Sequence, residues 1–258
     1  MKSLQFGFGN HKLYGVYHTP STINPNQKSI LICSSVGPES IHPYRLLRLL
    51  GEQLAQKGHH VFRFDWYGCG DSWGESSEIR IDHWINDVRS AAEELINLSG
   101  NQIFSIVGLR LGATIAWCSF TDSQEVSSVF LWDPVIYGAD WINEMNYLHS
   151  EYLSSFPQAK HHSTDEEILG FPLPSAVKNE ICALKIIGVK PPDLSRIHLL
   201  QSGDNPKCEE FCRSAGFPIT KEHLDMPEVW ASALLNNRIV MSHPAIKSII
   251  TFFDQVKP

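Results

Sequence analysis

Arg110 lies at the centre of Gly108-Leu109-Arg110-Leu111-Gly112, between an apolar strand-like run and a helix-like run of Leu, Ala, Ile and Trp. A strand, a sharp turn and a helix form the corner that presents a nucleophilic serine in acyl-transfer enzymes. The two glycines fit such a corner because its central residue is strained and the neighbouring backbones approach closely. A guanidinium stays protonated and is no nucleophile, but its five N–H donors suit a carboxylate or a phosphate. The segment therefore predicts a hydrolase-like corner rebuilt around a fixed positive charge.

A second segment, Gly70-Asp71-Ser72-Trp73-Gly74, matches Gly-x-Ser-x-Gly literally. Polar residues 75–78 follow it, whereas a nucleophile corner leads at once into a packed helix. We interpret the segment as a glycine-rich structural loop in which Asp71 and Ser72 hydrogen-bond to turn amides. Ser72 as the nucleophile is the alternative.

The elements around Arg110 alternate between strands and helices, which predicts a mostly parallel sheet covered on both faces. Residues 4–18 read as an opening hairpin around Gly9-Asn10. The expected strands are 29–33, 60–64, 103–107, 126–132, 197–201 and 217–223, and the expected helices are 44–56, 81–98, 111–120, 207–215 and 245–255.

The alternation stops between residues 134 and 195, a stretch rich in aromatic residues and prolines with helices expected at 141–155 and 174–187. A loop of this length is unusual, so we expect a helical cap over the carboxyl edge of the sheet. The chain is thus one α/β domain, 1–258, with a cap insertion at about 135–195.

Four segments resemble the α/β-hydrolase superfamily over nearly the whole chain. They are Phe64-Asp65-x-x-Gly68-x-Gly70-Asp71-Ser72-x-Gly74, Gly108-Leu109-Arg110-Leu111-Gly112-Ala113, Leu131-Trp132-Asp133-Pro134-Val135 and Leu169-Gly170-Phe171-Pro172-Leu173. They are most similar to the serine aminopeptidase-like and exosortase-associated hydrolase group, in a branch with Arg in place of the nucleophilic Ser. The resemblance implies the α/β-hydrolase fold, with a mostly parallel eight-stranded sheet, flanking helices, an inserted cap and a site at the carboxyl ends of the strands.

In that group a serine at the corner, an acid and a late histidine form the catalytic triad in this chain order. Asp204 follows the strand that normally supplies the acid, and Asp133 after the preceding strand is the alternate. Asp204 instead capping the next helix, and Asp133 starting a turn, are the structural alternatives. For the histidine we favour His243 over His223, although His243 also fits the start of the final helix. Without a serine, neither histidine has a nucleophile to deprotonate.

Oxyanion donors are expected from the backbone of Leu111 and from the segment containing Ser34 and Ser35. Together with Arg110 they would bind a carboxylate, a phosphopantetheine phosphate or an enolate. Trp141 in the cap would contact the substrate. The alternative is that Arg110 forms a buried ion pair with Asp204 or Asp133, a role that needs no ligand.

A cysteine is a further candidate nucleophile. Cys33 and Cys69 lie near the expected site, where Arg110 would lower a thiol pKa, but both also read as packed thiols. The histidine pairs 59–60 and 161–162 and the cysteines 208 and 212 lack a matching ligand set, so we assign no metal and no cofactor.

The bulk composition restricts the partners. The 258 residues carry 21 Lys and Arg against 28 Asp and Glu, a net charge of −7, with no basic run for nucleic acid. No signal peptide and no membrane span are recognised, so we expect a cytoplasmic protein. The oligomeric state is left open.

Three functions follow. The first is binding of a small acyl or carboxylate compound, possibly carrier-bound, and action on it without a serine acyl-enzyme through Arg110, with Asp204 or His243 handling protons. The second is a non-catalytic binding or scaffold protein. The third is an ester or thioester hydrolase with a relocated Cys nucleophile.

Overall fold

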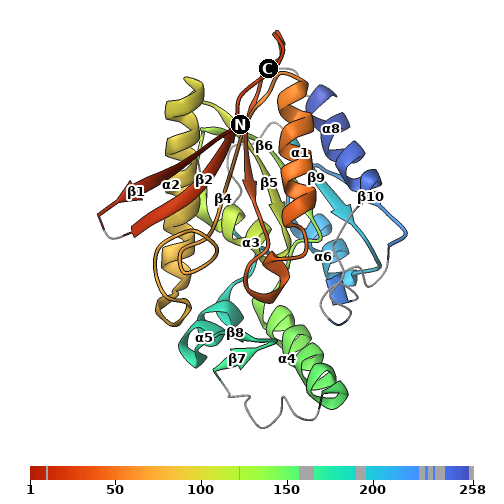
Figure 1. Ribbon diagram of the computed structural model, residues 1–258. Helices are drawn as coiled ribbons and strands as arrows, with labels where there is room; N and C mark the ends of the chain where they lie inside the picture. Colours follow the sequence, from red (N-terminus) through yellow and green to blue (C-terminus); the bar gives the residue numbers. More distant parts are fainter. Residues whose placement is uncertain are drawn as a thin grey trace.

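Eight strands form one sheet in the order β1-β2-β4-β3-β5-β6-β9-β10 (Figure 1). The computed structural model describes residues 1–9, 11–121, 123–156, 166–189, 196–226, 230–231, 235 and 242–255. β1 and β2 pair antiparallel, as do β2 and β4, and all other neighbours are parallel. The strands are β1 (Lys2–Phe8), β2 (His11–His18), β3 (Ser29–Cys33), β4 (His60–Phe64), β5 (Phe104–Leu109), β6 (Val126–Trp132), β9 (Arg196–Gln201) and β10 (Ile219–His223). The predicted mostly parallel eight-stranded sheet is confirmed.

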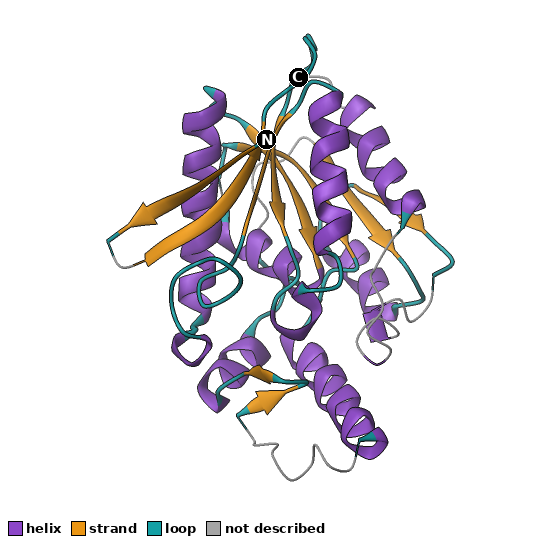
Figure 2. Ribbon diagram, viewed as in Figure 1, coloured by secondary structure: helices purple, strands orange, loops and turns teal. Residues whose placement is uncertain are grey.

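Helices cover both faces of this sheet (Figure 2). Successive side chains of a strand point to opposite faces, so Ile30 and Ile32 of β3 join one apolar cluster while Leu31 and Cys33 join the other. The first cluster includes α1 (Tyr44–Gln56) and α8 (His243–Gln255), and the second includes α2 (Ile81–Ser99), α3 (Arg110–Ser119) and α6 (Pro206–Ser214). None of the helices in the described ranges combines the length and the apolar character that crossing a membrane requires.

The helices and strands described between β6 and β9 lie beyond the carboxyl edge of the sheet (Figure 1). It contains α4 (Gly138–Ser155), the hairpin β7 (Glu167–Ile168) and β8 (Phe171–Pro172), and α5 (Ser175–Ala183). The helix expected at 174–187 is shorter because Leu184 is extended and Ile186 instead donates its backbone N–H to Ile136 O at 3.0 Å. The hairpin was not predicted, since its turn places Leu169 as well as Gly170 at positive φ, 50° and 82°.

Candidate functional site

Arg110 lies in a sharp turn between β5 and α3, as the glycine spacing predicts. Its φ is 51°, a left-handed conformation that side chains with a Cβ rarely adopt. A Cβ on Gly108 would lie 2.5 Å from Ala113 Cα, and one on Gly112 would lie 1.9 Å from Ser34 O. The turn therefore requires both glycines, and Gly112 brings the loop after β3 directly against the start of α3. We call this turn, residues 108–112, the strand–helix corner.

The Arg110 side chain is enclosed between two glutamates. Its Nε donates to Glu39 Oε1 at 2.8 Å and its Nη2 donates to Glu144 Oε2 at 2.6 Å. The guanidinium also lies over the Trp230 ring, 5.8 Å from its centroid. The ion-pair interpretation of Arg110 thus describes the geometry, but the partners are Glu39 and Glu144, and the expected pairing with Asp133 or Asp204 is wrong.

Glu39 is the buried half of this cluster. It lies in the short 3₁₀ helix η1 (Gly37–Ser40) that follows β3, and its side chain is fully buried. Its Oε2 accepts a hydrogen bond from Trp141 Nε1 at 2.9 Å. Burial raises the pKa of Glu39, while Arg110 and the Trp141 N–H act in the opposite direction by stabilising the carboxylate.

The same cluster joins the sheet to the cap. Trp141 and Glu144 both belong to α4, whereas Arg110 and Glu39 follow strands of the sheet. Burial lowers the pKa of Arg110, but the carboxylates of Glu39 and Glu144 outweigh it and hold that pKa above its ordinary value. Glu144 is 39% exposed, so the cluster reaches solvent on the cap side.

The expected oxyanion residues lie around the corner. Ser34 accepts hydrogen bonds from Trp66 Nε1 at its backbone O, 3.3 Å, and at its Oγ, 3.1 Å. Ser35 is buried and its Oγ donates to Glu39 O at 3.0 Å. Leu111 is buried in the first turn of α3, where backbone N–H groups have no acceptor within the helix.

Asp133 is close to the corner but its carboxylate holds two loops. Its φ is 44°, its Oδ1 accepts from Ser202 N at 2.7 Å and its Oδ2 accepts from Trp230 Nε1 at 2.7 Å. Both oxygens therefore have donors that position the backbone after β9 and a tryptophan. This is a structural role of the kind expected for an aspartate in a turn.

The other triad candidates are on the surface. Asp204 is exposed, and the expected capping role falls instead to Asn205, whose Oδ1 accepts from Lys207 N at 3.0 Å. His223 ends β10 and His243 begins α8, and both are exposed. Within the described ranges, no hydrogen bond or ion pair connects either histidine to Asp133, Asp204 or Arg110.

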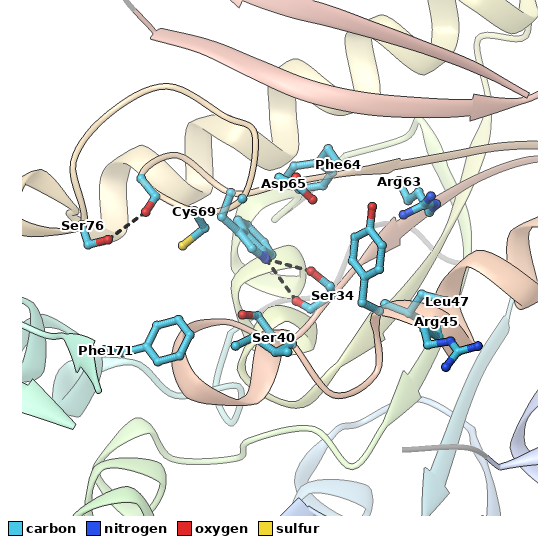
Figure 3. A pocket seen from close by; sticks show the side chains of 15 residues that line it. Ser34, Ser40, Arg45, Leu47, Arg63, Phe64, Asp65, Cys69, Ser76 and Phe171 are labelled. Atoms are coloured by element: carbon cyan, nitrogen blue, oxygen red, sulfur yellow. Dashed lines mark hydrogen bonds between the residues drawn. The ribbon is translucent and has the colours of Figure 1, made fainter. Parts of the chain in front are cut away.

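A pocket of about 620 Å³ lies beside the corner, with Ser34 on its wall (Figure 3). It is formed by the first turn of α1, the end of β4 and the loop after it, and Phe171 of β8. Its volume is in the range of small-molecule sites. Ser34 and Cys69, which the sequence places near the expected site, both line it, whereas Tyr44, Arg45 and Arg63 were not among the expected site residues.

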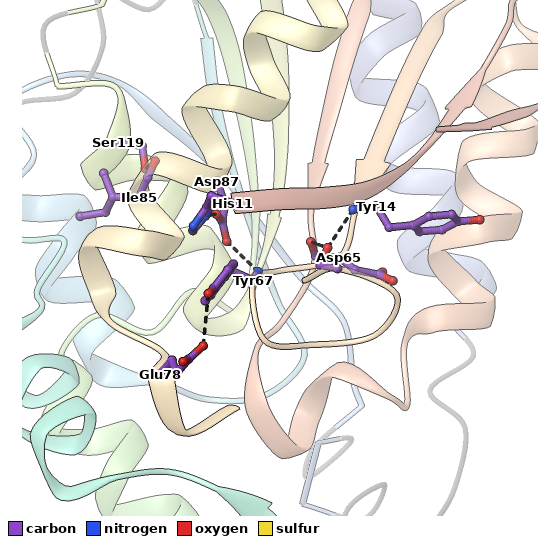
Figure 4. Close-up of polar contacts among 9 residues, drawn as sticks. His11, Tyr14, Asp65, Tyr67, Glu78, Ile85, Asp87 and Ser119 are labelled. Atoms are coloured by element: carbon purple, nitrogen blue, oxygen red, sulfur yellow. Dashed lines mark hydrogen bonds and ion pairs between the residues drawn. The ribbon is translucent and has the colours of Figure 1, made fainter. Parts of the chain in front are cut away.

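The glycine-rich loop after β4 is structural. Ser72 Oγ donates to Asp65 O at 2.5 Å and accepts from Tyr14 N at 2.9 Å, so Ser72 has structural hydrogen bonds, although its donor lies in β2 and not in the turn. Asp71 takes part through its backbone N–H, which donates to Asp65 Oδ2 at 3.1 Å. A buried carboxylate anchors the start of the loop, because Asp87 accepts from Tyr67 N at 2.8 Å and contacts His11 Nε2 at 2.6 Å (Figure 4). Burial raises the pKa of Asp87 to about 6.

The two candidate cysteines are poorly suited to attack. Cys33 is fully buried in β3, and burial raises the pKa of its thiol. Burial also raises the pKa of Cys69 to about 12. Since the thiolate is the nucleophile, a raised pKa disfavours attack by either side chain at neutral pH. No group of three or more His, Cys, Asp or Glu side chains with metal-binding geometry occurs among the described residues.

The chain resembles solved structures in fold. No protein-family model matches it, and no curated protein sequence matches it significantly. An esterase from Pyrococcus furiosus has a TM-score of 0.67 at 14% identity, over 100% of this chain and 91% of that one. An α/β serine hydrolase without a lid from Xanthomonas campestris has a TM-score of 0.63 at 13% identity, over 100% and 96%. Mouse alpha/beta hydrolase domain-containing protein 10 has a TM-score of 0.62 at 13% identity, over 99% of each chain. Together with the strand order, these similarities show that the chain has the α/β-hydrolase fold.

Proposed function

We propose that this protein binds a small acyl or carboxylate-bearing compound without forming an acyl-enzyme, and that Arg110 fastens the cap to the sheet. The observation that carries the proposal is the pairing of Arg110 with Glu39 and Glu144, at 2.8 and 2.6 Å, in the corner where the fold's enzymes keep a nucleophile. The cluster takes the place of a triad.

Among the described residues, the strand–helix corner has neither the nucleophile nor the acid and base that a serine-type mechanism requires. Arg110 has no nucleophilic lone pair, and both Asp133 oxygens are engaged by Ser202 and Trp230. The candidates Asp204 and His243 are exposed and are not hydrogen-bonded to the corner within the described ranges. A base and an acid that do not meet cannot activate a hydroxyl group.

An anion at Arg110 would have to compete with two carboxylates. Glu39 and Glu144 carry two negative charges against one on Arg110, so the cluster has an excess of one negative charge when all three are ionised. A ligand carboxylate would meet Glu39 repulsion at close range in a buried setting. We therefore assign ligand binding to the pocket beside the corner, and a structural role to Arg110.

The similar structures support the choice of ligand class. Two of them are described as an esterase and a serine hydrolase, which are enzymes for acyl groups. A protein that retains this fold and a pocket of about 620 Å³ but has lost the hydroxyl nucleophile is suited to holding such a compound.

Labelling with a fluorophosphonate probe tests the absence of an acyl-enzyme. We expect no labelling of the wild-type protein or of Arg110→Ser, because a serine at position 110 would have no histidine partner. An active serine hydrolase in the same reaction shows that the probe works. Stoichiometric labelling of any serine in the wild-type protein would contradict the proposal.

The enzymatic alternative predicts a different response to Arg110→Gln. If Arg110 polarises a substrate oxygen, the folded variant loses turnover of the native compound while ligand affinity changes little. If Arg110 is structural, the variant loses stability, and ligand affinity in the folded fraction is unchanged. Circular dichroism gives the folded fraction, so the two results are separable.

A further inference from the structure

The pocket beside the corner contains a buried cation whose role is not explained by the fold. Arg63 of β4 lines this pocket and is only 8% exposed. Burial of a charged group is costly unless it is paired or hydrogen-bonded. Within the described ranges, no carboxylate forms an ion pair with Arg63.

The contacts of Arg63 leave its outer nitrogens available. Its Nε donates to His18 Nε2 at 3.2 Å, and its guanidinium lies over the Tyr44 ring, 5.1 Å from the centroid. Burial lowers the pKa of His18 to about 4, so the imidazole is neutral at pH 7 and accepts this hydrogen bond. Among the described residues no hydrogen-bond partner of the two Nη groups is found, and Arg63 is one of the residues that line the pocket. A guanidinium held by Nε and stacked on a ring is oriented for bidentate binding of a carboxylate.

The charges on the pocket wall favour an anion. Arg45 and Arg63 line it against one carboxylate, Asp65. The Asp65 Oδ2 already accepts a hydrogen bond from Asp71 N at 3.1 Å. The first turn of the 13-residue helix α1 also forms part of the wall, and the positive end of its dipole adds to the field.

The remainder of the wall is largely apolar. Phe171 of the cap lies across the pocket from Arg63 (Figure 3), and Trp66 and Leu47 contribute further apolar surface. A ligand that fills this space has an apolar body, with one charged end at Arg63. A compound with two anionic groups would bring the second one against apolar side chains, at a desolvation cost.

We infer that the pocket binds a monocarboxylate with an apolar body of medium length, its carboxylate held by the Nη groups of Arg63. The inference rests on the proposed function and adds to it the site and the chemical class of the ligand. The ligand is recognised by Arg63 and the start of α1, and the hydrogen bonds of the Arg110 cluster are not used.

Calorimetric titration with octanoate tests this site, with 1-octanol as a neutral compound of the same chain length. We expect saturable octanoate binding at one site and at least about tenfold weaker binding of 1-octanol, because a hydrogen-bonded charge contributes about 10- to 100-fold in affinity. Both ligands are measured on the wild-type protein, so this comparison does not depend on the folding of a variant.

Arg63→Gln and Arg48→Gln form a matched pair of variants. Arg48 lies on α1, pairs with Glu52 at 2.9 Å and does not line the pocket, so its loss removes the same charge from the surface. We expect octanoate affinity to fall about 10- to 100-fold in Arg63→Gln and to change less than twofold in Arg48→Gln. Equal affinities for octanoate and 1-octanol, equal effects of the two substitutions, or no saturable octanoate binding would each overturn the inference.

The two proposals fail in different ways. Arg63-dependent octanoate binding together with a fluorophosphonate-labelled serine would refute the absence of an acyl-enzyme and leave the pocket assignment intact. An unlabelled protein that does not bind octanoate would refute the pocket assignment and leave the conclusion about the corner intact.

Discussion

Replacing Arg110 by methionine removes the guanidinium that bridges Glu39 and Glu144 while keeping a long unbranched side chain. The positive φ of 51° disfavours methionine and arginine alike, so the backbone strain is nearly unchanged. What changes is the charge balance around Glu39, whose side chain is 0% exposed. Breaking a buried pair by removing one partner costs about 3–5 kcal/mol, so we expect Arg110→Met to lower the free energy of unfolding by that amount.

The loss of stability expected on replacing Glu144 is smaller, because this carboxylate is 39% exposed. Water compensates for a lost partner there, so Glu144→Gln should cost about 1 kcal/mol or less. The double variant Arg110→Met with Glu39→Gln replaces the buried charges by neutral groups and should recover most of the loss. The amide oxygen introduced by Glu39→Gln would still offer an acceptor to Trp141 Nε1, which now donates to the Glu39 carboxylate at 2.9 Å.

Equilibrium unfolding in urea, followed by tryptophan fluorescence and circular dichroism, measures these differences. The expected order of stability is wild type, then Glu144→Gln, then the double variant, then Arg110→Met. A loss below about 1 kcal/mol for Arg110→Met, or no recovery in the double variant, would refute the view that Arg110 fastens a buried carboxylate.

The pH dependence of Arg110→Met gives an independent check. Burial raises the pKa of Glu39 in the folded state, and the shift becomes larger when the cation is removed. For an acid with a raised folded pKa, stability is fully present below the unfolded pKa, near 4.3, and is lost as pH rises through the folded pKa. The variant should therefore approach the wild type in stability as pH is lowered from 7 to 5. A difference in the free energy of unfolding between the two proteins that grows as the pH is lowered would contradict the view that Glu39 is the buried carboxylate paired with Arg110.

Three further predictions follow from individual contacts. Gly112→Ala should cost at least about 2 kcal/mol in urea unfolding, because the added Cβ would lie 1.9 Å from Ser34 O. Asp133→Asn should cost about 1–3 kcal/mol, since one of its two accepted hydrogen bonds is lost, whereas the exposed Asp204→Asn should change stability by less than about 0.5 kcal/mol. Burial lowers the pKa of His59 to about 4, so the unfolded chain takes up a proton below about pH 6.5 while the folded protein does not. The free energy of unfolding of the wild type therefore falls on acidification. Between pH 7 and 5, His59→Asn should lose about 1–2 kcal/mol less of this free energy than the wild type.

The regular part of the fold was predictable because its apolar patterns repeat over whole elements. The strands at 29–33, 60–64 and 126–132 and the helix at 44–56 begin and end at the residues expected from the sequence. The corner was predictable for a different reason. The backbone leaves no room for a Cβ at positions 108 and 112, so the spacing of the two glycines in the sequence indicates the sharp turn.

The partners of Arg110 were not predictable from local patterns. Glu39 and Glu144 are 71 and 34 residues away along the chain, one in a loop after β3 and the other on a cap helix. The acids expected from the sequence, Asp133 and Asp204, lie after later strands, and Asp204 is exposed. The available signal was the run Val36-Gly37-Pro38-Glu39, in which a lone carboxylate follows a short, largely apolar strand into the expected site.

Arg63 carries a sequence signal of the same kind. In His60-Val61-Phe62-Arg63-Phe64 the arginine shares a face with Val61, which belongs to the cluster under α1 and α8. A charged residue on a covered face of a sheet is uncommon and calls for a partner or a ligand. The local sequence does not show that His18 of β2 and Tyr44 of α1 lie against Arg63. These two contacts determine which N–H groups of the Arg63 guanidinium remain without a partner.

Strain in the backbone does not by itself identify a catalytic residue in this fold. Among the described residues, Arg110 and Asp133 are two of three non-glycine residues at positive φ, and they directly follow the neighbouring parallel strands β5 and β6. Each such conformation costs on the order of 1–3 kcal/mol and persists where the surroundings impose it. Here the surroundings are visible: Gly112 against Ser34 O, two glutamates on Arg110, and two donors on Asp133. The two carboxylates beside Arg110 belong to its own chain and would repel an anionic ligand, whereas Arg63 forms no ion pair among the described residues and lines a pocket. Ligand chemistry in this protein should therefore depend on Arg63 more than on the strained corner.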